Sequence, residues 1–395
     1  MERVKRAIMQ VKPRDIVALL IFLLMLIPSL IFRLVNKLKH RKLWLVAEQG
    51  EARDNGYHFY KYVREKHFSD YCFYAINPES AGYKKVEKLG NVIKWGSLKH
   101  WLYYMSANLN ISSQKSGNPA PIFWYVVHVK LGLYRNRVFL QHGITQNDVK
   151  FLYYNQTRFR YFICGAKREY DYILKNFGYK KKSLLLTGFP RWDNLEDTSK
   201  KQKNKSILIM PTWRNWLGGE KNRFFETKDF LDTDFYKNWF AFLNDRDFIK
   251  YLEKNNITAY FFPHINMYPF IEFFKSPSMR ITIVSIGEDI QEYFNKCDLM
   301  ITDYSSVAFD FAYLGKPILY YQFDEEEFRE RQYSSGYYKY NNDGFGPVVK
   351  TKKIAVDKAL EILEKDLKYN DRVDAFFQDV PRDCCRRLYE RLVNR

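Results

Sequence analysis

Short apolar runs alternate with longer amphipathic segments twice along this chain, and this alternation constrains the fold more than any other feature. In the first half, the expected strands are 43–47, 71–76, 91–94, 138–141, 161–164 and 183–187, and the expected helices are 57–66, 97–108 and 167–177. Strands that are mostly apolar and separated by helices are typical of a parallel sheet covered on both faces. The pattern therefore predicts a Rossmann-like α/β domain in this half.

A second α/β set follows a polar, lysine-rich stretch at 194–204. Its expected strands are 206–210, 258–262, 281–285, 298–302 and 318–321, and its expected helices are 235–254, 288–295, 305–314, 354–368 and 382–393. Single cores stop growing at roughly 250–300 residues, and this chain has 395. We expect two Rossmann-like domains, at 43–195 and 205–350, that face a central cleft, and C-terminal helices at 351–395.

The N-terminal 42 residues carry a membrane signal. They contain ten Lys and Arg but only Glu2 and Asp15, so +8 of the formal charge of +19 lies there. Residues 16–32 are apolar or small, carry no charge and include Pro28. This run is short for a spanning helix of about 20 residues, and basic residues flank both ends equally. We expect 1–42 to be an in-plane or re-entrant anchor on an anionic leaflet, with a single spanning helix or a buried core helix as alternatives.

Two histidines lie where ligands of open α/β sheets bind, just beyond the carboxyl ends of strands. His142 follows the expected strand 138–141 and precedes Gly143, and His264 follows the expected strand 258–262. Either histidine alone is more simply explained as a hydrogen-bonded core residue. Two of them at corresponding places in two domains favour an active site, because a histidine titrates near neutral pH and can act as a general base.

An anion site is predicted after the expected strand 298–302. Thr302 and Asp303 end this strand, and Ser305 and Ser306 begin the expected helix. Hydroxyls, free N–H groups and the positive end of a helix dipole suit a diphosphate. The simpler alternative makes Ser305 an N-cap and Asp310 an acid of the first turns.

Turn-forming and basic residues follow two more expected strands. These candidates are Gly188 and Arg191 after 183–187, and Pro211, Thr212 and Arg214 after 206–210. An arginine can bind phosphate oxygens with two parallel hydrogen bonds, although each of these could equally be a surface residue.

The sequence argues against several classes of protein. Asp232 and Asp234, and Asp245 and Asp247, form acidic pairs at or within the expected helix 235–254, where capping or solvation explains them, so we expect no metal and no cofactor. The sequence has no GxGxxG, P-loop or GxSxG motif and no nucleic-acid-binding signature. Its five cysteines are odd in number and lack metal-ligand spacing, which favours a reducing compartment.

Together these segments resemble the CDP-glycerol glycerophosphotransferases, the family that builds teichoic acids and related polyol-phosphate polymers. The resemblance rests on QHG at 141–143, GFPRWDNL at 188–195, MPTWRN at 210–215, FFPH at 261–264, CDLMITDYSSVAFDFAYLGKPILYY at 297–321, EARDNG at 51–56 and GSLKHWLYYMSAN at 96–108. It covers nearly everything from residue 43 to about 350, and the combination is far more specific than any single motif.

The resemblance implies a GT-B-like fold in which the second domain binds CDP-glycerol and an acceptor approaches from the first. An acceptor hydroxyl would attack the β-phosphorus of CDP-glycerol and release CMP. The implied roles are a general base for His142, stabilisation of the diphosphate or protonation of the leaving phosphate for His264, diphosphate binding for Thr302, Ser305 and Ser306, and support from Arg214 and Asp303.

The implied partners are CDP-glycerol or CDP-ribitol, an undecaprenyl-diphosphate-linked sugar or a growing polymer, and an anionic membrane, at the cytoplasmic face of the bacterial cell membrane. Because no further domain accompanies the catalytic one, a priming activity is favoured over elongation. A GT-B glycosyltransferase that uses a nucleotide sugar, and a non-enzymatic binder of anions, are the alternatives. The choice between glycerol and ribitol and the oligomeric state stay open.

Overall fold

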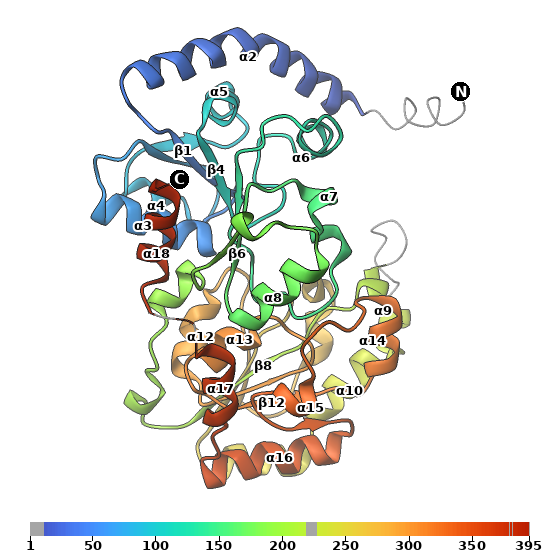
Figure 1. Cartoon of the computed structure of the whole chain (residues 1–395). Coiled ribbons are helices and arrows are strands. Elements are labelled where there is room, and N and C mark those ends of the chain that lie inside the picture. The colour runs from blue at the N-terminus through green and yellow to red at the C-terminus, as the bar shows by residue number, and fades with distance from the viewer. Residues whose placement is uncertain (1–11, 219–226, 379, 381, 395) are drawn as a thin grey trace. The chain divides into compact units, whose positions relative to one another are not determined.

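The computed structural model describes residues 12–218, 227–378, 380 and 382–394, and the chain divides into two compact units (Figure 1). The first unit comprises Met1–His142, Lys150–Asn194 and Val380–Arg395, and the second comprises Gly143–Val149 and Leu195–Asp379. The chain therefore enters the second unit briefly after His142 and returns to the first unit at its end. The expected separate segment 351–395 is instead shared between the two units.

The first unit contains a seven-stranded sheet in the order β3-β2-β1-β4-β5-β6-β7. The strands are β1 (Trp44–Gly50), β2 (Cys72–Ile76), β3 (Val92–Lys94), β4 (Leu109–Ser112), β5 (Arg137–Phe139), β6 (Tyr161–Cys164) and β7 (Leu184–Leu186). Every neighbouring pair is parallel. The strand order reverses between β1 and β4, and open α/β sheets bind ligands beyond the carboxyl ends of the strands at such a reversal.

The second unit repeats this arrangement in a six-stranded sheet of order β10-β9-β8-β11-β12-β13. Its strands are β8 (Ser206–Met210), β9 (Thr258–Phe261), β10 (Ile281–Ile283), β11 (Leu299–Thr302), β12 (Ile318–Tyr321) and β13 (Val348–Val349). All pairs are again parallel, and the order reverses between β8 and β11.

Helices accompany both sheets. The first unit holds α2 (Pro13–Leu38), α3 (Asn55–Lys66), α4 (Tyr83–Glu87), α5 (Leu98–Ser106), α6 (Pro121–Tyr125), α7 (Tyr154–Thr157), α8 (Lys167–Asn176) and α18 (Cys384–Val393). The second holds α9 (Thr227–Leu231), α10 (Asp234–Leu243), α11 (Arg246–Lys254), α12 (Ile290–Lys296), α13 (Ala308–Tyr313), α14 (Glu325–Arg331), α15 (Tyr340–Asp343), α16 (Lys352–Lys365) and α17 (Asn370–Phe377). Strands β2, β6, β11 and β12 are buried at every position, as expected for parallel strands covered on both faces. The predicted α/β class with two parallel sheets is confirmed.

Two helices differ from their expected form, and a third, the last, is held by the first unit. The expected helix 235–254 is two helices, because the Asp245 carboxylate accepts hydrogen bonds from the backbone N–H groups of Asp247 and Phe248 and starts α11 anew. The expected helix 305–314 begins only at Ala308. The last helix, α18, is held in the first unit, where the Asp193 carboxylate accepts hydrogen bonds from its first two backbone N–H groups.

The apolar N-terminal segment forms one continuous helix, α2, which runs through Pro28 and is longer than the uncharged run. In Figure 1, α2 (blue) arches over α5 and α6. Its inner side chains, including Ala18 and Phe22, pack with Trp101 of α5 and Trp124 of α6 in a core that also contains residues of β1 and β2. One face of α2 is therefore part of the core of the first unit.

Candidate active site

The backbone that carries His142 is fixed from several sides in the first unit. Gln141 has a positive φ of 61°, and its buried amide donates hydrogen bonds to the Ile163 carbonyl at 2.6 Å and to Glu169 at 3.0 Å. The Asn55 amide nitrogen, 2.8 Å from the Gln141 carbonyl oxygen, holds the same turn. The His142 side chain is 57% exposed, so this rigid turn presents an accessible imidazole just beyond β5.

Asp54, at the start of α3, binds this imidazole. Asp54 Oδ2 lies 2.6 Å from His142 Nδ1, and Asp54 Oδ1 accepts a hydrogen bond of 2.6 Å from the Arg191 guanidinium. Burial raises the pKa of Asp54, but the charge of Arg191 and the contact with His142 outweigh it and lower this pKa to about 2. The carboxylate is thus ionised and accepts a hydrogen bond from Nδ1–H, which leaves Nε2 of the neutral ring as its basic atom.

The pKa of His142 follows from the same pair. Desolvation lowers this pKa, but the hydrogen bond to Asp54 and its negative charge raise it above the ordinary histidine value. A histidine with an ionised carboxylate on one nitrogen and an accessible second nitrogen has the arrangement of a general base.

Glu48, near the end of β1, has a buried carboxylate close to Asp54. Its carboxylate accepts hydrogen bonds from the Ser113 hydroxyl, from the Tyr74 hydroxyl at 2.9 Å and from the Gly56 N–H at 2.7 Å. Burial, and then the charge of Asp54, raise the pKa of Glu48. A Cβ on Gly56 would lie 2.6 Å from Glu48 Oε1, so only glycine fits there.

Three of the residues predicted for this site are placed by packing within the protein: Gly143, Gly188 and Arg191. Arg191 is buried against Asp54, and its backbone N–H donates to Asn55 Oδ1 at 3.2 Å. Gly188 has a φ of 73°, and a Cβ there would lie 2.5 Å from Cys384 Sγ. Gly143 is the first residue of the segment that packs in the second unit. Arg191 therefore orients the His142–Asp54 pair by holding Asp54.

In the second unit, Arg214 is fully buried between two carboxylates at the β8–β11 reversal. Its guanidinium lies 2.9 Å from Asp303 Oδ2 and 2.7 Å from Asp324 Oδ2. Burial lowers the pKa of Arg214, but these two charges raise it above its ordinary value, and burial raises the pKa of Asp303 despite the arginine. Arg214 therefore fixes the loops that follow β8 and β11.

Around this ion pair lie the other predicted anion-binding residues. The Thr302 hydroxyl is committed to the Met210 carbonyl at 2.6 Å, and the Thr212 N–H donates to Asp303 Oδ1 at 2.9 Å. Pro211 is buried, as is Asp310 on α13. Thr212 Oγ1 is buried and has no hydrogen-bond partner in the part of the chain that the structure describes.

Ser305 and Ser306 are half-buried in the loop between β11 and α13. Among the described residues, no acceptor binds the backbone N–H groups of 305–307. The Gln146 amide donates to the Tyr304 carbonyl at 2.8 Å, so the segment that follows His142 packs directly against this loop. The loop offers two hydroxyls and three N–H groups to an anion.

His264 is half-buried at the end of β9 and differs electronically from His142. Its Nδ1 accepts a hydrogen bond of 3.2 Å from the Asn266 N–H, so the ring proton lies on Nε2. The ring lies parallel to the Trp213 indole, with centroids 6.4 Å apart. Burial lowers the pKa of His264. Near neutral pH, His264 is an uncharged hydrogen-bond donor, whereas the pKa of His142 is shifted in the opposite direction.

The acidic pairs have other roles. Asp245 caps α11 and forms an ion pair of 2.6 Å with Lys352. Within residues 12–218 and 227–378 and the described C-terminal residues, no three His, Cys, Asp or Glu side chains come together as a metal site.

The fold and the histidine–carboxylate pair define a two-domain α/β protein with an accessible, carboxylate-bound histidine beyond the carboxyl ends of the strands of its first sheet. Residues 29–383 match the family model described as CDP-Glycerol:Poly(glycerophosphate) glycerophosphotransferase. The chain belongs to this family, which confirms the resemblance of its motifs.

Individual relatives agree with this assignment. The minor teichoic acid biosynthesis protein GgaB of Bacillus subtilis is 32% identical over 376 residues, which cover 92% of this chain but 40% of GgaB. A teichoic acid poly(glycerol phosphate) polymerase of Bacillus spizizenii is 25% identical over 90% of this chain and 92% of its own length. The chain thus spans less than half the length of GgaB.

Among solved structures, the wall teichoic acid polymerase TagF has the same fold, with a TM-score of 0.65, 18% identity and 97% of both chains covered. The predicted GT-B-like class, with two Rossmann-like domains, is therefore confirmed.

Proposed function

We propose that this chain transfers glycerol phosphate from CDP-glycerol to a hydroxyl of a lipid-linked sugar or a growing polyol-phosphate chain, and releases CMP. The observation that carries the proposal is the hydrogen bond of 2.6 Å between His142 Nδ1 and the ionised Asp54, which makes Nε2 of an accessible ring the basic atom. Family membership supports CDP-glycerol as the donor and a poly(glycerophosphate) chain as an acceptor.

In this mechanism Nε2 of His142 takes the proton of the acceptor hydroxyl as its oxygen attacks the β-phosphorus of CDP-glycerol. The bond from that phosphorus to the bridging oxygen breaks, and the oxygen leaves with CMP. Phosphoryl transfer of this kind depends mainly on positioning and on stabilisation of charge. No covalent intermediate on the protein is required.

The diphosphate is assigned to the second unit. Ser305, Ser306 and the N–H groups of 305–307 would bind its oxygens, while Arg214 and Asp303 keep the two loops in place. His264 Nε2–H would donate to a phosphate oxygen, and its lowered pKa favours this role over protonation of the leaving group.

The proposal also places the protein on the cytoplasmic face of the cell membrane, through α2. One helix in the described chain, α2, is long and apolar enough to cross a bilayer. Its inner face packs in the core, whereas the outer face exposes leucines and isoleucines such as Leu20, Ile27 and Leu30, at 61%, 69% and 63%. A helix with one face in the protein core and the other apolar suits an in-plane position better than a spanning one.

The donor is tested by incubating the full chain on vesicles with an acceptor and CDP-glycerol, CDP-ribitol or a UDP-sugar. Release of CMP from CDP-glycerol, lost in His142→Ala, is expected. Faster release from CDP-ribitol would replace the glycerol donor by ribitol, and release of UDP alone would identify a glycosyltransferase and overturn the proposal.

A further inference from the structure

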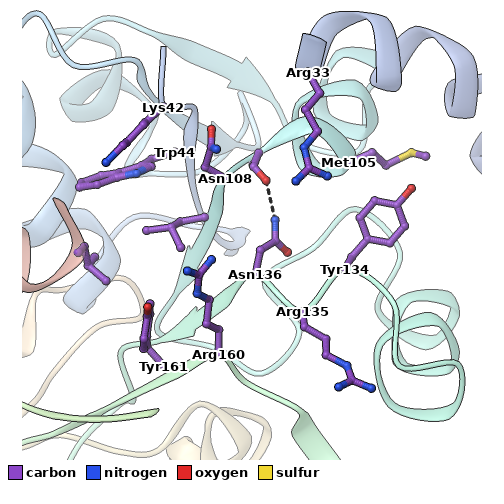
Figure 2. Close-up of a pocket in the computed structure, with 13 residues that line it drawn as sticks. Arg33, Lys42, Trp44, Met105, Asn108, Tyr134, Arg135, Asn136, Arg160 and Tyr161 are labelled. Carbon is purple, nitrogen blue, oxygen red and sulfur yellow. Dashed lines mark hydrogen bonds between the residues drawn. The ribbon is translucent and has the colours of Figure 1, made fainter. Parts of the chain in front are cut away.

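A cavity of about 430 Å³ in the first unit is lined by none of the candidate active-site residues (Figure 2). It is lined by Arg33 of α2, by Trp44 at the start of β1, by Asn136 just before β5 and by Arg160 and Tyr161 at the start of β6. These positions are the amino ends of parallel strands. His142 follows the carboxyl end of β5, so the cavity and the catalytic pair lie at opposite edges of one sheet.

The cavity is strongly basic. Arg33, Lys42, Arg135 and Arg160 line it, no acidic residue does, and none of the four forms an ion pair within the described chain. Figure 2 shows the guanidinium groups of Arg33 and Arg160 on either side of Asn136 in the lining of the cavity. The Arg135 side chain points away from that space and donates to the Gly132 carbonyl at 2.7 Å.

This geometry selects an anion with several oxygens. Each guanidinium can donate two parallel hydrogen bonds to one phosphate group, and two opposed guanidinium groups suit a phosphate between them. Asn136 adds an amide whose nitrogen is already bonded to the Ala107 carbonyl at 2.7 Å, so its orientation is fixed. Its carbonyl oxygen accepts a hydrogen bond of 3.3 Å from the Asn110 amide and has a second lone pair for a hydroxyl of the ligand.

The neighbouring surface is apolar. Arg33 lies on α2 between Leu30 and Leu34, which are 63% and 56% exposed. Tyr134, half-buried in the lining, is a residue type enriched where protein meets the polar region of a bilayer. A ligand with both a phosphate and acyl chains satisfies the cavity and this surface together.

We propose that the cavity binds the phosphate of one anionic glycerophospholipid, whose acyl chains lie along the exposed face of α2. This site rests on the proposed in-plane position of α2 and not on the transfer chemistry. It gives the enzyme a discrete lipid contact in addition to diffuse attraction between basic residues and an anionic leaflet.

The test uses the full-length chain and soluble dihexanoylphosphatidylglycerol, with native mass spectrometry to count bound lipid and titration to measure affinity. The wild type is expected to retain one lipid per chain. The variant Arg33→Gln with Arg160→Gln should bind about tenfold more weakly or less. Lys84→Gln with Lys88→Gln, which removes the same charge from exposed positions outside the cavity, should bind as the wild type does.

Binding of other phosphate-containing ligands shows whether the cavity prefers the phosphate of a lipid or that of a soluble compound. Inorganic phosphate, glycerol phosphate and dihexanoylphosphatidylcholine should all bind more weakly than the anionic lipid. Equal binding of inorganic phosphate, or stronger binding of a polyol-phosphate oligomer, would overturn the lipid assignment. Unchanged lipid affinity in the arginine variant would overturn the site itself.

Failure of this site and failure of the proposed membrane position are distinguishable. Leu20→Gln with Ile27→Gln tests α2 by sedimentation with vesicles, whereas the short-chain lipid tests the cavity without a bilayer. The arginine variant should keep the wild-type melting temperature and the wild-type rate of CMP release from a soluble acceptor. A loss of both would make its lost lipid binding a consequence of misfolding, and Arg33→Lys with Arg160→Lys, which keeps the charge, must then restore binding or the site is wrong.

Discussion

Asp54 determines which nitrogen of His142 is basic. Its two carboxylate oxygens hold two hydrogen-bond donors, His142 Nδ1 and the Arg191 guanidinium, each at 2.6 Å. Without the carboxylate, the imidazole can place its proton on either nitrogen, and its conjugate acid loses a stabilising charge. The chemistry of His142 therefore depends on a residue that lies 88 positions earlier in the chain.

The variant Asp54→Asn tests this dependence through a pH profile. A general base must be unprotonated, so the wild-type kcat should rise with pH through the raised pKa of His142. In the variant, kcat should fall by about 10²–10⁴-fold, and the midpoint of the rise should move to lower pH. A variant that keeps both the rate and the wild-type midpoint would contradict the role of Asp54.

Asp54 also makes stability depend on pH. Its pKa falls from the ordinary aspartate value of 3.8 to about 2 in the folded chain, which corresponds to about 2 kcal/mol of stabilisation that is present above pH 4. This stabilisation should be lost as the pH falls from 4 to 2. Denaturant unfolding at several pH values should show a steeper loss in the wild type than in Asp54→Asn, and equal slopes would contradict the ion pair with Arg191.

In the proposed mechanism His264 donates a hydrogen bond, and a pair of substitutions can separate this role from a structural one. His264→Ala removes the Nε2–H donor and should lower kcat by about 10²–10³-fold with little change in KM. His264→Gln restores an N–H donor and should recover part of that loss. If CMP release is equally slow in both variants while both melt as the wild type does, simple hydrogen-bond donation is the wrong role.

The two faces of helix α2 differ, because the inner face packs in the core and the outer face is apolar and exposed. The outer face is available for lipid. Gln substitutions at Leu20 and Ile27 leave the packed residues Ala18 and Phe22 in place. They should release the protein from anionic vesicles but keep the melting temperature and the turnover of a soluble acceptor. The matched control is Leu98→Gln with Ile286→Gln, two apolar residues of similar exposure outside α2. Retention of the α2 variant on vesicles would contradict the in-plane anchor.

Strands and helices with a strong local pattern of apolar residues could be predicted from the sequence. Those with a weak pattern could not. Strands β6, β8 and β12 begin and end where their apolar runs do. Strand β4 was not expected, because two of its four residues, Asn110 and Ser112, are polar and resemble a loop. The break between α10 and α11 depends on whether Asp245 points outward or caps a helix, and spacing alone does not decide this.

At the scale of the whole molecule, the predicted topology located the candidate site residues at the strand ends. It did not predict which of these residues bind one another. Both histidines lie just beyond strands, as expected, because the carboxyl ends of parallel strands meet at one edge. Arg191 and Arg214 were expected to face phosphate, yet they bind carboxylates 137 and 110 positions away along the chain. Such long-range pairs follow from strand order, which a single sequence does not reveal. Asp54 was overlooked although it lies in the EARDNG motif just after β1, where the same strand-end argument would have found it.

The central claim, transfer of glycerol phosphate by a His142 base, is tested most directly by the ratio of two products. The full chain on anionic vesicles is incubated with CDP-glycerol and a defined lipid-linked acceptor, and released CMP is compared with the glycerol phosphate gained by the acceptor in mass spectrometry. We predict one CMP for each glycerol phosphate in the wild type, and loss of both products in His142→Ala with an unchanged melting temperature. Release of CMP without a gain in acceptor mass, or a His142→Ala variant as fast as the wild type, would contradict the account.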